Sequence, residues 1–397
     1  MTNHISFIAK KLLISNIFFR AGNIITKIFV NIYILKSTWD LRIVAGFSLM
    51  LLFFHLFSYT LFSWLVKYGY KNISHIFSIF GTVTIYLFFV FFPEQIGEYA
   101  LYIGWVIWFF SGIYWCVFNN HQFDLTLPKN RGNFEWLKKS LRTVVTLIVP
   151  ILAGSIITLN YLWFGYQSVF LLGALFYFIS WVLGIVNIDV TSTSGFTPMK
   201  LLREMNVHKD IWKYIIMLFL ISFALSLPLI EVIFPLIFYT RWIEELWIGL
   251  FVSGISIISI FASYIFGKFV HYKYYKRSFI TSGLIYFIFI ALLVVHPTEL
   301  MFAVFVSSVT FLYVFCDIPL SVFTSNVFHE IKDYNEYKEE YILLREISVI
   351  FWRMLVFVII FFLGSLGDTS IQFIFWAMWA MMLLAIALFY STNLSHE

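Results

Sequence analysis

The chain has 397 residues, of which 61% are hydrophobic and only 12% charged, with a mean hydropathy of +0.89. This composition excludes an ordinary water-soluble protein and predicts an all-α integral membrane protein. The net charge of +5 indicates no nucleic-acid partner, because the basic residues are dispersed over many short segments and never form one patch. Cys116 and Cys316 each lie within an apolar run, which excludes a disulfide framework and a cysteine-built metal site.

Runs of about 20 apolar residues predict membrane-spanning helices. The first run carries Arg20 and Lys27 and lacks a small-residue cleavage site, so a retained helix is expected and not a removed signal peptide. Twelve spans are predicted, near 12–35, 43–66, 74–92, 99–118, 142–160, 166–188, 212–239, 246–270, 279–296, 299–325, 342–364 and 369–390.

Polar residues in the first span fall on one line. At about 100° per residue, an arc of roughly 80° holds Asn16, Arg20, Asn23, Lys27 and Asn31. A charged side chain at the bilayer centre costs on the order of 3 kcal/mol or more unless it faces protein or water. The pattern therefore predicts a helix with a polar stripe that lines a cavity, and the alternative is a buried structural network.

The loop charges predict the orientation. If the N-terminus is cytoplasmic, twenty Lys and Arg residues lie in the N-terminal tail and the even-numbered loops, against three in the opposite loops, namely Lys36, Arg42 and Arg241. This asymmetry predicts that both termini lie in the cytoplasm and that the protein sits in the cytoplasmic membrane.

Three long polar interruptions are predicted to be cytoplasmic loops: Asn119 to Ser140, Asp189 to Asp210 and Asn326 to Glu340. The middle one divides the helices six and six. We therefore expect an N-terminal bundle at 1–188, a central loop at 189–211 and a C-terminal bundle at 212–397, related by pseudo-two-fold symmetry.

Some loop residues carry a family pattern. The segment after the second span has Phe62, Val66, Lys67, Gly69 and Lys71, and the matching segment of the second half reads Gly267-Lys268-Phe269-Val270-His271-Tyr272-Lys273. Together with twelve helices and cytoplasmic termini, this pattern resembles the major facilitator superfamily. The aspartate of the family's loop motif is missing here, so the charge clasp of that motif lacks its carboxylate.

The resemblance implies that helices one, four, seven and ten line a central cavity. Helix four then offers an aromatic and amide face with Trp108, Trp115 and Asn119. The alternative for this face is ordinary packing, since 22% of the chain is aromatic. Helix ten offers a second stripe that includes Tyr313 and Asp317.

Deep charges are candidates for ion coupling. Glu231 lies between Pro228 and Pro235 in helix seven and is expected to face Lys27, whereas Asp317 and Arg353 lie at comparable depth on consecutive helices. An ion pair between Asp317 and Arg353 would be either structural or functional. The deep cations Arg20, Lys27 and Arg353 outnumber the two deep acids by one. This excess of positive charge favours a solute with an anionic or electron-rich polar group.

The expected function is secondary active transport of a small solute by alternating access, driven by a proton or another ion, since the chain has no ATP-binding domain. Substrate binding is assigned to Arg20, Asn23, Lys27, Asn31, Trp108, Trp115, Asn119 and Tyr313, and ion coupling to Asp317, Glu231 and Arg353. No cofactor, metal site or catalytic residue is expected, and His121 is placed at the rim of the bundle. The protein is expected to be a monomer. Alternatives are a flippase for lipid headgroups on the same fold and a membrane-embedded transferase.

Overall fold

Helices make up the regular structure of the described residues. The computed structural model describes residues 6–125, 128–159, 164–184, 197, 199–200, 209–224, 244–295, 298–329, 338–363 and 368–391. In the first half these are α1 (Phe7–Ile25), η1 (Thr26–Val30), α2 (Asn31–Thr38), α3 (Leu41–Lys67), α4 (Lys71–Phe91), α5 (Gln95–Glu98), α6 (Ala100–Leu125), α7 (Pro128–Leu159) and α8 (Gly165–Gly184). In the second half they are α10 (Lys209–Ala224), α12 (Glu245–Phe269), η3 (Tyr272–Tyr274), α13 (Tyr275–Val295), α14 (Glu299–His329), α15 (Lys338–Leu363) and α16 (Asp368–Ser391).

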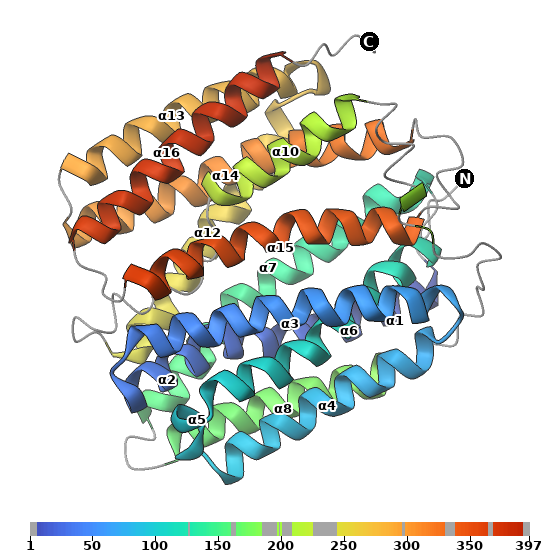
Figure 1. The fold of residues 1–397 in the computed structure, drawn as a ribbon, viewed down its shortest axis with the longest axis vertical. Coiled ribbons are helices and arrows are strands. Elements are labelled where there is room, and N and C mark those ends of the chain that lie inside the picture. Colours follow the sequence, from blue (N-terminus) through green and yellow to red (C-terminus); the bar gives the residue numbers. More distant parts are fainter. Residues whose placement is uncertain are drawn as a thin grey trace. The chain divides into compact units, whose positions relative to one another are not determined.

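These helices follow the predicted apolar segments in chain order (Figure 1). Each of the twelve predicted spans overlaps a helix, and within the described residues nine are long and apolar enough to cross a membrane. The prediction of an all-helical membrane protein is therefore confirmed.

The chain divides into two compact units. Unit 1 holds residues 1–196 and 231–254, and unit 2 holds residues 197–230 and 255–397, so that α12 begins in unit 1 and continues into unit 2. In unit 1, α3 packs along α6, α1 along α8, and α4 against both α8 and α6. In unit 2, α13 packs on α14 and α16, and α10 on α16 and α15. The predicted six-plus-six bundle boundaries stay a prediction.

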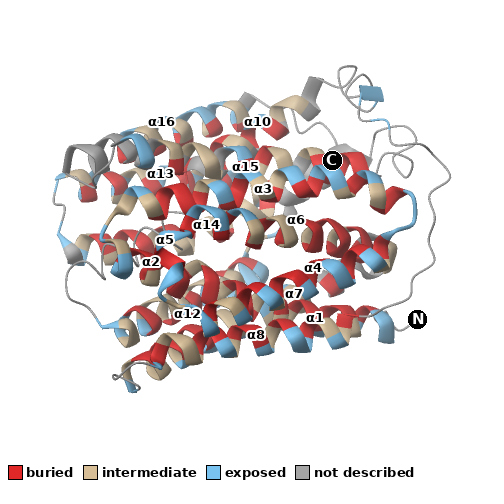
Figure 2. Ribbon diagram, turned by 60° about the horizontal axis from the view of Figure 1, so that its bottom comes forward, coloured by how far each residue is buried: buried red, intermediate tan, exposed pale blue. Residues whose placement is uncertain are grey.

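The first span is an interior helix of unit 1. Of its most apolar stretch, 67% is buried by protein alone, the highest share among the described spans, and Figure 2 shows α1 as mostly buried or half-buried. Burial on most sides explains how this helix can carry polar residues, since their partners come from protein.

Local signals fix several helix ends. Ser6 caps α1 by accepting a hydrogen bond from the Ala9 amide at 3.2 Å, and Asp40 caps α3 by accepting one from Arg42 at 2.8 Å. The turn between α3 and α4 places Gly69 at φ 93°, a left-handed conformation that favours glycine. These caps and this turn mark the ends of the first three spans.

The predicted loop from Asn119 to Ser140 is wrong for most of its length. Helix α6 continues to Leu125, and α7 already begins at Pro128, 14 residues before the predicted span. Proline is favoured in the first turn of a helix because its missing N–H needs no partner there. Hydropathy locates the apolar part of a helix, whereas the polar continuation is stabilised by its own backbone hydrogen bonds.

Candidate functional site

Arg20 of α1 lies against an aromatic ring inside unit 1. Its Cζ is 4.6 Å from the centroid of Trp115 on α6, and its Nε donates to Asn16 Oδ1 at 3.1 Å. The Asn16 amide in turn donates to the Tyr114 hydroxyl at 3.1 Å. A guanidinium above an indole face is held by a cation–π interaction, which is stronger when the pair is shielded from water. The structure thus brings together the predicted residues Arg20 and Trp115.

Asn23 has a tyrosine partner within unit 1. Only 8% of Asn23 is exposed, and its Oδ1 accepts a hydrogen bond from the Tyr177 hydroxyl of α8 at 3.2 Å. One turn further on, Thr26 hydrogen-bonds to Tyr86 of α4. This part of the stripe contacts neighbouring helices of its own unit, and the role of Asn23 in solute binding stays a prediction.

Lys27 and Asn31 lie where the first span changes its winding. Residues 26–30 form the π-helix η1, and the Asn31 amide donates to the Lys27 carbonyl at 2.7 Å. Asn31 is only 1% exposed, and its Oδ1 atom is buried without a hydrogen-bond partner. Short π segments in helices often accompany functional sites. Asn31 therefore presents an unused acceptor beside Lys27, which is half-buried.

The α6 face divides into two parts. Asn119 uses its amide to donate to the Tyr59 hydroxyl at 3.0 Å. Trp108 is 8% exposed, lies 5.2 Å from the ring of His55, and its indole Nε1 has no hydrogen-bond partner. A buried indole N–H without an acceptor is an available donor.

In unit 2, Tyr313 donates to Asp317 Oδ1 at 3.1 Å across one turn of α14. Both side chains are half-buried, as is Arg353 of α15. No ion pair joins Asp317 to Arg353 in this conformation of the described chain. Glu231 lies outside the described residues, so its expected position opposite Lys27 stays a prediction.

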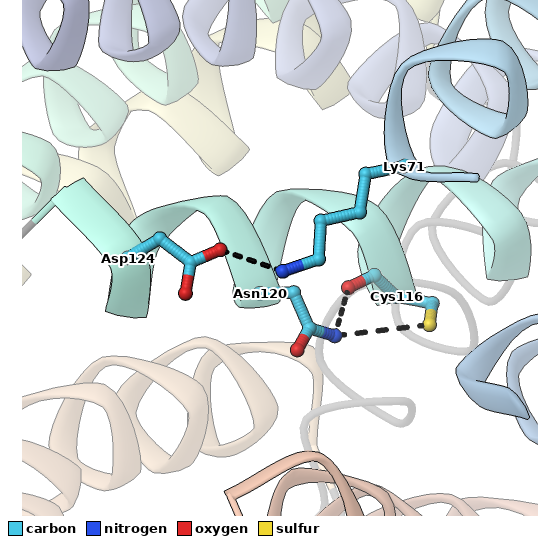
Figure 3. A network of polar contacts seen from close by, with 4 residues as sticks. All are labelled: Lys71, Cys116, Asn120 and Asp124. Atoms are coloured by element: carbon cyan, nitrogen blue, oxygen red, sulfur yellow. Dashed lines mark hydrogen bonds and ion pairs between the residues drawn. The ribbon is translucent and has the colours of Figure 1, made fainter. Parts of the chain in front are cut away.

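A buried ion pair lies where α4 begins and α6 ends. Lys71 Nζ is 2.7 Å from Asp124 Oδ2, and the two side chains are 4% and 3% exposed (Figure 3). Lys67, at the end of α3, is 2% exposed. The sequence places both lysines in a loop, yet they are buried. Lys71, a residue of the loop pattern, thus pairs with a carboxylate of α6.

Two histidines lie next to this pair. His75 and His121 are each 2% exposed, and their ring centroids are 6.2 Å apart. The expectation that His121 lies at the rim is wrong, because α6 continues past it to Leu125 and His121 is buried. His75 is not among the predicted site residues, although its position four residues after Lys71 places both on one face of α4.

At the other end of unit 1, the start of α12 is fastened by polar contacts. Tyr166 of α8 donates to Glu245 Oε1 at 2.9 Å, and Lys36 Nζ lies 3.7 Å from the same oxygen. Ser253 donates to the Leu147 carbonyl of α7 at 2.7 Å. The first turns of α12 are therefore bound to α2, α7 and α8.

No family model matches the chain. The chain is 24% identical over 332 residues to the uncharacterised protein YqgE of Bacillus subtilis, covering 82% of this chain and 75% of that one. It is 30% identical over 158 residues to an uncharacterised protein of the sodM 3′ region of Geobacillus stearothermophilus, covering 39% of this chain and 72% of that one.

Solved structures share the fold over nearly the whole chain. A D-xylose-proton symporter matches with a TM-score of 0.69 and 12% identity over 97% of both chains. The human organic anion transporter MFSD10 matches with a TM-score of 0.68 and 12% identity over 96% of this chain and 98% of that one. A bacterial homologue of the iron transporter ferroportin, in its inward-facing state, matches with a TM-score of 0.66 and 15% identity over 96% of this chain and 98% of that one. The fold is that of the major facilitator superfamily.

Proposed function

The chain belongs to the family of the Geobacillus stearothermophilus protein and has the fold of major facilitator transporters, and from this premise we propose that it is a secondary transporter. It moves a small solute across the cytoplasmic membrane by alternating access, with both termini in the cytoplasm. The solute carries an anionic or electron-rich polar group. The protein works as a monomer.

The observation that carries this proposal is the position of Arg20 on Trp115. A cation kept within a membrane span is expensive, and such residues usually mark a path for a solute or an ion. The indole face and Asn16 hold the guanidinium in place. An anion that reaches Arg20 would therefore find a preorganised partner.

Further groups suit the rest of such a solute. Trp108 offers an indole N–H and Asn31 an amide oxygen, both buried and without a hydrogen-bond partner. The named neighbours are a homologue of an iron transporter, a D-xylose-proton symporter and an organic anion transporter, so the fold leaves the solute open. The charge of Arg20 favours the organic anion class among these.

Coupling to an ion gradient is assigned first to Asp317 of unit 2. Asp317 can hold a proton, and Tyr313 keeps its carboxylate oriented at 3.1 Å. Arg353 and Glu231 are the other proposed coupling residues. An isolated carboxylate in a low-dielectric site favours the neutral form and a nearby guanidinium the ionised form, so that approach of Arg353 would release the proton.

The test is a transport screen with purified protein in proteoliposomes. Radiolabelled organic anions, sugars and metal ions are offered under an imposed pH gradient, and uptake and efflux are measured. Accumulation of one class above empty liposomes is expected. Fluorescent phospholipid redistribution, measured in the same vesicles, would instead support the flippase alternative and contradict the solute proposal.

Arg20→Gln identifies the site in that assay. Loss of the cation should reduce uptake of the anion at least about tenfold, since a buried charge-assisted hydrogen bond contributes roughly 1.5–3 kcal/mol. The control is Arg42→Gln, because Arg42 is exposed at the start of α3. Wild-type uptake by Arg20→Gln would show that Arg20 is a structural residue.

A further inference from the structure

We infer that His75 and His121 form a proton-binding site inside unit 1, in which Asp124 can leave Lys71 to balance the bound proton. The inference rests on the proposed ion-coupled function and adds a second coupling site, separate from Asp317. It concerns residues to which the sequence analysis assigns no function.

The first argument is the state of His75. Both ring nitrogens of His75 are buried and have no hydrogen-bond partner, and the residue is 2% exposed. Its ring lies 5.4 Å from that of Tyr114, and a Cβ added to Gly184 of α8 would lie only 2.3 Å from Nε2. Buried polar groups usually have hydrogen-bond partners, so an imidazole with two unpartnered nitrogens costs free energy. We take this cost as a sign that the nitrogens gain partners in another state, when the ring is protonated.

The second argument is the arrangement of four residues on two helices. Lys71 and His75 are four residues apart on α4, and His121 and Asp124 are three residues apart on α6. Residues with these spacings lie on one helix face. Asp124 pairs with Lys71 at 2.7 Å in this structure, but it is also within one turn of His121. The carboxylate is thus placed to accept either cation.

Charge limits the site to one proton. With neutral imidazoles, Lys71 and Asp124 balance each other, and one bound proton adds a single positive charge. A second proton would place two imidazoliums with ring centroids 6.2 Å apart in a buried site, and like charges at this distance oppose each other. The two rings therefore titrate as a pair and not as independent groups.

The proton would act on the candidate solute site through named contacts. Tyr114 contacts the His75 ring and accepts a hydrogen bond from Asn16, which accepts one from Arg20. A charge at His75 would therefore lie next to Tyr114, the end of the hydrogen-bonded series that leads through Asn16 to Arg20. The titratable and charged groups that the described contacts and helix spacings place beside the pair are Lys71 on α4 and Tyr114 and Asp124 on α6.

The experiment measures proton binding without any solute. The purified full-length protein in unbuffered detergent solution is titrated between about pH 8 and 5, where histidine charges change, and the protons taken up per molecule are counted. His75→Gln/His121→Gln should take up about one proton fewer than the wild type. His271→Gln, which removes an exposed histidine of unit 2, is the control variant.

Two results would overturn the inference. A double variant whose titration curve matches the wild type would show that both imidazoles stay neutral as packing groups. A loss of two protons would show independent histidines. If the double variant does not fold, Asp124→Asn decides, because loss of the counter-ion should move the remaining uptake to lower pH, and an unmoved curve contradicts the site. Since no solute is present, a negative transport screen leaves this result intact, and the reverse also holds.

Discussion

At the scale of single residues, the polar groups of this chain differ in how completely their neighbours satisfy them. Asn16, Asn23 and Asn119 each have a tyrosine hydroxyl as partner, so their amides have a structural use in unit 1. Asn31 and Trp108 each keep a buried atom without a hydrogen-bond partner. Since orphaned buried polar atoms are rare in folded proteins, these two residues are the better candidates for solute contact.

Asp317→Asn tests ion coupling at a single residue. Asparagine keeps an oxygen that can accept the hydrogen bond from Tyr313, so the local fold should persist, but it cannot bind and release a proton. We expect loss of gradient-driven accumulation in proteoliposomes, while exchange of solute across the membrane continues.

Glu98→Gln is the matched control, because it makes the same carboxylate-to-amide change at an exposed residue of α5. It should still accumulate solute. If Asp317→Asn accumulates solute against its gradient, Asp317 is a structural residue and Glu231 becomes the coupling candidate.

Part of the site is predictable from the sequence because charged residues in an apolar run are conspicuous. Arg20 and Trp115 are both predicted site residues, and they do contact each other. His75 is not predicted, since a histidine near an expected loop resembles a surface residue until tertiary packing buries it. The burial of Lys71 escapes prediction for the same reason, as a partner on α6 cannot be recognised from spacing along α4.

At the scale of elements, helix winding explains one limit of sequence reasoning. The predicted polar stripe assumes 100° per residue along the whole first span, but residues 26–30 adopt the wider π winding. An added residue in one turn rotates the C-terminal part of the helix by roughly 100° relative to the N-terminal part. Asn31 therefore need not lie on the same face as Arg20. No rule of composition locates such a segment, because it depends on contacts such as that of Thr26 with Tyr86.

The crossing of α7 and α12 gives a stability prediction. A Cβ at Gly249 would lie 2.4 Å from the Pro150 carbonyl oxygen, a backbone atom that cannot turn away. Gly249→Ala should therefore lower the free energy of unfolding by about 1–3 kcal/mol, the usual cost of overpacking. The measurement is thermal unfolding in detergent, followed by intrinsic fluorescence.

Gly254→Ala on the same helix is the control, because a Cβ there meets no described atom within 4 Å. Alanine has the higher helix propensity by up to about 1 kcal/mol, so this variant should be neutral or more stable. Equal unfolding temperatures for Gly249→Ala and Gly254→Ala would show that α7 and α12 do not cross closely in the membrane.

At the scale of the whole molecule, the order of the helices is predictable from the sequence, whereas the contacts that join the first turns of α12 to unit 1 are not. Twelve apolar runs are visible because lipid demands about 20 apolar residues per span. The first turns of α12 nevertheless belong to unit 1, through Glu245 and Ser253. Such a division depends on a few polar contacts and on close glycine packing, which neither hydropathy nor loop length reveals.

The orientation of the whole chain is predicted by its loop charges and can be tested by labelling. Lys139 on α7 and Arg277 on α13 are exposed and are predicted to face the cytoplasm, whereas Arg42 on α3 is exposed and predicted to face outward. Single cysteines at these positions are introduced after replacement of the two buried cysteines, Cys116 and Cys316, neither of which forms a disulfide. In intact cells, a membrane-impermeant maleimide should label Arg42→Cys and leave Lys139→Cys and Arg277→Cys unlabelled until the membrane is opened.

The reverse pattern would invert the topology, because twenty cations would then have crossed the membrane against the bias that normally retains them. Labelling of Lys139→Cys and Arg277→Cys from opposite sides would instead contradict an even number of spans between α7 and α13.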